Sequence, residues 1–139
     1  MFSEPDSPSA SAFVGGACLT PMHVAYLVTT ILAALANGYA AILNFTGAES
    51  VKVVADRVHV ARRWMIPFGT LLALGASGLL VGIWVPMLGE ATATCLIVYF
   101  LCALAAHVRA RDVHVGGAVT FLVLAVGSLL TSLGYHHRG

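Results

Sequence analysis

Apolar and polar positions alternate along the chain in long blocks. Four apolar runs are separated by short polar segments: Met22–Phe45, Trp64–Val85, Ala91–His107 and Val115–Leu133. Each run has about the length that a helix needs to cross a hydrocarbon core of about 30 Å. In lipid, only helices and closed barrels satisfy every backbone hydrogen bond. The pattern therefore predicts an all-α integral membrane four-helix bundle.

The longest polar interruption is ESVKVVADRVHVARRW, residues Glu49 to Trp64. Its apolar positions recur at helical spacing up to Met65, with charged residues on the other side, which predicts an amphipathic helix lying in the membrane interface between the first two spans. The spacing also predicts pairs between Lys52 and Asp56 and between Asp56 and His59. Two interpretations stay open: a solvated connector, or a lid over a pocket that opens toward the cytoplasmic leaflet.

Composition supports the membrane assignment. Hydrophobic residues make up 59% of the 139 positions and charged residues only 9%, and the mean hydropathy is +0.91, which lies far from the mix of a soluble domain. A net charge of +1 indicates no nucleic-acid partner. The three cysteines form no CxxC or zinc spacing, so we expect neither a disulfide framework nor a metal site, and no cofactor.

The basic residues predict the orientation. Six of the seven lie in two loops, between the first and second runs and between the third and fourth: Lys52, Arg57, Arg62, Arg63, Arg109 and Arg111. The positive-inside rule places both loops in the cytoplasm and both chain ends outside. We expect residues 1–20, rich in Ser, Pro and Gly, to be a disordered extracytoplasmic tail, residues 21–135 to be the membrane domain, and residues 136–139 to be a short tail.

Small residues at helical spacing predict close helix packing. Gly75, Gly78 and Gly82 share a face of the second run, and Gly127 and Gly134 recur in the fourth. Such positions let helix backbones approach each other where lipid provides no hydrophobic attraction between helices.

A polar stripe follows the first run. Thr30, Asn37 and Asn44 are seven residues apart and therefore share one helix face. Polar groups at membrane depth need partners or a cavity. The stripe is therefore either packing between helices or a row that faces a ligand.

The third run carries a second, mildly polar face that includes Cys95, Tyr99 and Cys102 and ends at His107. Histidine exchanges protons near neutral pH, which makes His107 the candidate for acid-base chemistry. The alternative is a partner for the helix dipole or a lipid headgroup contact. No Ser-His-Asp spacing, HExxH, phosphate-binding loop or thiol pair accompanies it.

Three stretches, AYLVTTILAALANGYAA, PFGTLLALGASGLLVG and AAHVRARD, resemble the DoxX-like family of small four-helix membrane proteins common in actinobacteria. The resemblance spans about residues 22 to 133 and implies that Asn37, His107, Arg109 and Asp112 belong to the site. Relatives often carry an ionisable residue where this chain has Leu72, and an acid where it has Asn44. Family members are implied as partners of quinone-linked enzymes, as parts of oxidative-stress complexes or as assembly factors.

Two function classes follow. The first is a membrane partner or subunit, in association with another membrane protein or a second copy, or a binder of a small apolar ligand such as a quinone or isoprenoid. The second is a membrane-embedded isomerase, cyclase or epoxide-opening enzyme. In that case His107 moves the proton, Asn37 and Asn44 orient the substrate oxygen, and Tyr99 supports them. Convergence of His107, Asn44 and Asn37 on one cavity would favour the enzyme.

Overall fold

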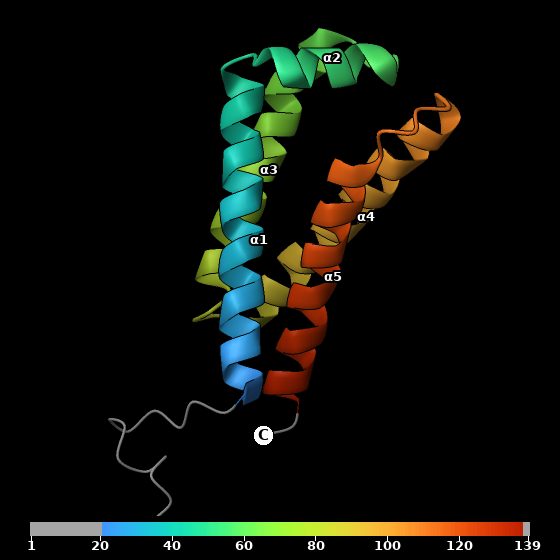
Figure 1. Ribbon diagram of the computed structural model, residues 1–139. Coiled ribbons are helices and arrows are strands. Elements are labelled where there is room, and N and C mark those ends of the chain that lie inside the picture. Colours follow the sequence, from blue (N-terminus) through green and yellow to red (C-terminus); the bar gives the residue numbers. More distant parts are fainter. Residues whose placement is uncertain (1–20, 138–139) are drawn as a thin grey trace, which may run out of the picture.

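The computed structural model describes residues 21–137, and these residues are entirely helical apart from turns (Figure 1). The elements in chain order are α1 (Pro21–Phe45), α2 (Glu49–Arg57), the 3-10 turn η2 (Arg62–Trp64), α3 (Met65–Val81), α4 (Pro86–Arg109) and α5 (Gly116–His136). Within this part of the chain, four helical segments are long and apolar enough to cross a membrane: Pro21–Phe45, Arg62–Val81, Pro86–Arg109 and Gly116–His136. The predicted four-helix membrane architecture is confirmed. The predicted tail of residues 1–20 lies outside the described residues, as do the last two residues of the predicted C-terminal tail.

Two span boundaries differ from the prediction. Helix α3 ends at Val81 instead of continuing to Val85, and α4 begins at Pro86 instead of Ala91. Proline is favoured in the first turn of a helix because its missing N–H would have no partner there. Hydropathy could not locate this turn, because its residues are as apolar as the helices that it joins.

The four long helices pack in a ring. Helix α1 lies against α3 and α5, and α4 closes the ring against α3 and α5. In Figure 1, α4 and α5 diverge from α1 and α3 toward the end where α2 lies across the bundle. We call this end the α2 end.

Glycines pin α3 to α4 at the opposite end of the bundle. A Cβ atom at Gly75 would lie 2.7 Å from Cδ2 of Leu96, and one at Gly82 would lie 2.7 Å from the backbone nitrogen of Gly89. Real Cβ atoms do not approach other atoms so closely. The tip of Leu96 could move aside at Gly75, but the atoms opposite Gly82 are backbone, so glycine is required at that crossing. The predicted packing face of the second span therefore holds the two helices together near the 82–85 turn.

Large apolar side chains lie on the exterior of the bundle. Small or polar side chains such as Ala33, Thr30 and Ser128 are buried, whereas Leu35 and Leu74 are about two-thirds exposed, at 66% and 65%. A surface of this kind is stable where the surrounding solvent is lipid.

The polar interruption forms a shorter helix than predicted. Helix α2 ends at Arg57, and His59 takes the left-handed conformation with φ 56°. The N–H of Val60 donates to the carbonyl of Ala55 at 2.9 Å, which completes a helix-terminating Schellman turn. The predicted continuation of the amphipathic helix to Met65 is therefore wrong.

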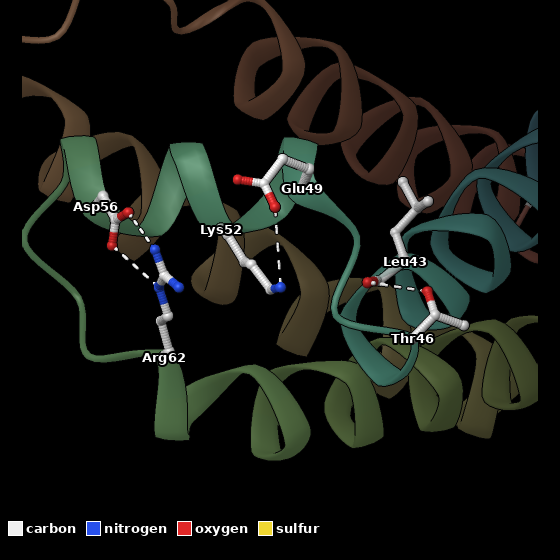
Figure 2. Close-up of polar contacts among 6 residues, drawn as sticks. All are labelled: Leu43, Thr46, Glu49, Lys52, Asp56 and Arg62. Carbon is white, nitrogen blue, oxygen red and sulfur yellow. Dashed lines mark hydrogen bonds and ion pairs between the residues drawn. The ribbon is translucent and has the colours of Figure 1, made fainter.

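The predicted charge pairs on this segment are also wrong. Lys52 pairs with Glu49 at 3.8 Å, and Asp56 pairs with Arg62 at 2.8 Å (Figure 2). The reversal of the chain after α2 brings Arg62 back beside Asp56. The guanidinium hydrogen bond of Arg62 lowers the pKa of Asp56 below its usual value.

Candidate functional site

A cavity of about 320 Å³ lies at the α2 end. Its walls come from α1, α2, α3 and α4 and from the segment that follows α2. Three apolar residues of α2 contribute to it, namely Val51, Val54 and Ala55, followed by Val58 at the C-cap of the helix. The apolar face of α2 therefore covers a cavity instead of only facing lipid. This is the arrangement that the interpretation of α2 as a lid requires.

Three polar side chains interrupt the apolar lining: Asn44 from α1, and Tyr99 and His107 from α4. All three were predicted as site residues. His107 is 7% exposed and Asn44 is 8% exposed. The splay of α4 away from α1 at this end leaves room between these side chains, whereas the glycine crossing at the other end leaves none.

The turn that ends α4 places the carboxylate of Asp112 beside the imidazole of His107. The N–H of Asp112 donates to the carbonyl of His107 at 2.9 Å, and Arg111 takes the left-handed conformation with φ 56°. This Schellman turn folds the chain back over the last helical turn. As a result, Nδ1 of His107 lies 2.9 Å from Oδ2 of Asp112.

Asp112 is held as an anion by its own neighbours. Its Oδ1 accepts from the backbone N–H of His114 at 3.1 Å and contacts Nδ1 of His114 at 3.0 Å. The backbone N–H of His114, followed by the side chains of His114 and His107, lowers the pKa of Asp112 to about 2 against the opposing effect of partial burial. An ionised carboxylate only accepts hydrogen bonds, so the proton between the two side chains belongs to Nδ1 of His107.

Asn44 is fixed at the cavity edge by the close approach of α1 and α3. Its Nδ2 donates to the carbonyl of Ala40 at 2.8 Å. A Cβ atom at Gly69 would lie 3.0 Å from Cβ of Asn44, so the glycine makes space for the asparagine. Among the described residues, no donor reaches Oδ1 of Asn44.

Tyr99 is positioned by aromatic packing. Its ring meets Phe68 edge-on with centroids 5.9 Å apart, and Phe100 with centroids 5.0 Å apart. Its hydroxyl makes no hydrogen bond within residues 21–137. A tyrosine held by its ring and left free at its hydroxyl is suited to contact a ligand.

The predicted stripe on the first span divides by depth. Thr30 contacts Ser128 of α5 through their hydroxyls at 3.2 Å, which is packing between helices. Asn37 is 1% exposed and donates to the carbonyl of Ala33 at 2.7 Å, while its Oδ1 is buried without a hydrogen-bond partner among the described residues. Only Asn44 reaches the cavity.

Three predicted site residues, Asn37, Arg109 and Asp112, do not line the cavity. Asn37 lies deeper in the bundle, and Arg109 is exposed near the end of α4. Asp112 contributes indirectly, through His107. The convergence that would favour an enzyme is therefore partial, since His107 and Asn44 meet at one cavity without Asn37.

His114 and the α3 residues Met65 and Phe68 were not predicted as parts of this region. An aspartate side chain often bonds to the backbone two residues further on. The spacing of Asp112 and His114 was therefore a signal in the sequence for the role of His114. Residues 21–137 contain no cluster of three or more His, Cys, Asp or Glu side chains that could hold a metal ion.

The fold and cavity define a class: a small multi-pass helical membrane protein with an apolar cavity at one end of its bundle. A family model described as the DoxX-like family matches residues 28–128. The chain belongs to this family, as the sequence resemblance implied. Neither a curated protein nor a solved structure matches the sequence.

Proposed function

We propose that the protein binds a small, largely apolar molecule that carries oxygen, such as a quinone or an isoprenoid, in the cavity under α2. One observation carries the proposal. Three side chains that line one apolar cavity, His107, Asn44 and Tyr99, each keep a polar atom without a hydrogen-bond partner in the described part of the chain. These atoms are Nε2 of His107, Oδ1 of Asn44 and the hydroxyl oxygen of Tyr99.

None of these three atoms is among the fully buried polar atoms that lack a partner, so each is accessible from the cavity. A ligand that covered one of them without offering a partner would lose about 1–3 kcal/mol. A ligand oxygen that bonds to these groups avoids that loss, and a hydrocarbon portion would fill the apolar walls. The volume is at the lower end of the range of about 300–1,000 Å³ that ligand pockets occupy, which suits one ring or a short prenyl chain.

The location supports a ligand that arrives through the membrane. The basic loops predict that the α2 end faces the cytoplasm and that both chain ends lie outside. Helix α2 lies across the bundle there (Figure 1). Its apolar residues Val51, Val54 and Ala55 line the cavity. Displacement of α2 would open the cavity at the level where a bilayer presents the polar ends of quinones and prenols. Such a binder would serve as a carrier or subunit for another membrane protein.

Thiol protection tests the proposal. Cys102 lines the cavity, whereas Cys95 lies in a separate surface hollow between α3 and α4. The experiment uses a Cys18→Ser variant, in which these are the two remaining thiols. Decylubiquinone and farnesol, tested separately, should slow alkylation of Cys102 by a small maleimide about tenfold at saturation, and alkylation of Cys95 should not change. If both probes leave the Cys102 rate unaltered, the binding function is wrong.

Two neighbouring valines provide a matched control. Val54 lines the cavity and Val53 does not, although both are 39% exposed. Val54→Trp should fill the cavity and remove the protection of Cys102. Val53→Trp should preserve it.

The contact between His107 and Asp112 favours a second candidate, an enzyme that isomerises an epoxide-bearing isoprenoid. In its protonated form, His107 would give the proton on Nε2 to the epoxide oxygen as the C–O bond breaks. It would then take a proton from the adjacent carbon as a C=C bond forms. The product is an allylic alcohol, and no co-reactant is consumed. Asn44 would orient the oxygen, with Tyr99 beside it.

The enzyme predicts that His107→Ala abolishes turnover while the protein still accumulates in the membrane and binds farnesol. Asp112→Asn should lower turnover less severely, because it removes the anion but keeps a side chain that can contact Nδ1. Turnover by His107→Ala at the wild-type rate would eliminate this candidate.

A further inference from the structure

The hydrogen bond at Nδ1 of His107 determines whether the other ring nitrogen, Nε2, donates or accepts a hydrogen bond. Because Asp112 accepts at Nδ1, the neutral imidazole carries its proton there. Its Nε2 is then a lone pair with no proton. Within residues 21–137 no donor reaches this atom. In the neutral side chain, Nε2 is therefore an unused acceptor at the cavity.

Asn44 presents a second acceptor. The carbonyl of Ala40 can only accept a hydrogen bond, so the Asn44 atom 2.8 Å away is the donating Nδ2. This contact fixes the amide orientation and leaves Oδ1 and the second N–H of Nδ2 without a partner among the described residues. Tyr99, the third polar residue of the lining, has a hydroxyl that can both donate and accept.

The lining therefore offers two acceptor atoms, Nε2 of His107 and Oδ1 of Asn44, beside one N–H donor of Asn44 and the Tyr99 hydroxyl, which can donate or accept. We propose that the cavity selects ligands whose polar end carries a hydroxyl able to donate a hydrogen bond, such as phenols and prenols, over ligands whose oxygens only accept. The inference rests on the proposed binding function and specifies the ligand class for the same site. His107 and Asn44 act as specificity-determining residues.

An acceptor-only ligand would leave both acceptors unpaired. Its oxygen could take a hydrogen bond from Tyr99, but Nε2 of His107 and Oδ1 of Asn44 would remain desolvated beneath it. Sites built to bond a substrate hydroxyl discriminate strongly against analogues that lack it, because the polar groups of the protein are then left without partners. A hydroxyl ligand donates to one of the two acceptors, so it leaves one of them unpaired instead of two, and it can accept from Tyr99.

A matched pair of probes isolates the hydroxyl. Para-hexylphenol and para-hexylanisole differ by one methyl group, and the ether cannot donate. Each is titrated against the full chain in nanodiscs, in the Cys18→Ser background, with the Cys102 alkylation rate as the readout and Cys95 as the internal control. The ratio of the two half-protection concentrations is measured in the wild type and in His107→Phe. Comparing the two ratios cancels the different partitioning of the probes into lipid.

We expect the ratio of half-protection concentrations, which measures the preference for the phenol, to fall about tenfold in His107→Phe. A tenfold change in affinity is about the contribution of one net hydrogen bond. Asn44→Leu should reduce the ratio independently. An unchanged ratio in both variants, with both probes still protecting Cys102, overturns the selectivity and leaves the binding function in place. Failure of both probes to protect wild-type Cys102 removes the binding function and this inference with it. A His107→Phe protein that does not fold leaves Asn44→Leu as the deciding measurement.

Discussion

The closest helix crossing in the bundle lends itself to a quantitative test by Gly82→Ala. The added Cβ atom would lie 2.7 Å from the backbone nitrogen of Gly89 and even closer to its Cα atom. Carbon contacts are most favourable at about 3.5–4.0 Å, so α3 and α4 would have to separate by about 1 Å. No side chain can move aside, because the opposing atoms are backbone. The shift would also disturb the hydrogen bond of 3.2 Å from the Tyr26 hydroxyl to the Gly82 carbonyl.

Overpacking of this kind costs about 1–3 kcal/mol. We expect Gly82→Ala to lower the free energy of unfolding by that amount. Gly38→Ala is the control, because a Cβ atom there would lie 4.0 Å from Cβ of Ala76, an ordinary contact. It should be neutral or stabilise the protein by about 0.5–1 kcal/mol, the usual advantage of alanine over glycine in a helix.

The measurement is reversible unfolding in mixed detergent micelles, followed by circular dichroism as the denaturing detergent fraction rises. Both variants must first match the wild type in helix content under native conditions. If Gly82→Ala is as stable as Gly38→Ala, then α3 and α4 do not cross at these glycines. The explanation of why the bundle is closed at this end and open at the α2 end would then be wrong.

Three further predictions concern single positions. His59 and Arg111 occupy left-handed turns with φ 56°; His59→Gly should therefore stabilise the protein by about 1 kcal/mol, and His59→Val should destabilise it, both by the same detergent titration. Asn37→Leu removes a buried carbonyl oxygen that lacks a partner among the described residues; it should leave protection of Cys102 by farnesol intact without loss of stability, whereas Asn44→Leu should weaken that protection. The pKa of Asp112 lies at about 2, below its ordinary value of 3.8, so its stabilising contribution should be fully present above about pH 4 and lost as the pH falls through about 2. The difference in melting temperature between the wild type and Asp112→Asn should accordingly be present at pH 5 and shrink toward pH 2; a difference already gone at pH 5 would contradict the assignment.

Sequence alone determined the number of spans, the amphipathic connector and the family. A span needs only enough apolar residues in succession, and this property is local. The candidates His107, Asn44 and Tyr99 were also within reach of sequence reasoning. Polar side chains in apolar helices are few, and each needs a physical explanation.

Tertiary structure alone decided which of these side chains share a cavity. Residues spaced by seven, such as Asn37 and Asn44, lie on one helix face, but their surroundings depend on how far α4 stands from α1 at each depth. At the other end of the bundle, remote from the cavity, α3 and α4 are in contact at Gly82 and Gly89. The pairing of Asp112 with His107 likewise depends on the left-handed turn at Arg111. Arginine rarely adopts this conformation, so the sequence gives little sign of the turn. Hydropathy reports whether a helix lies in lipid, whereas the rotation and tilt of each helix follow from contacts between residues far apart in the chain.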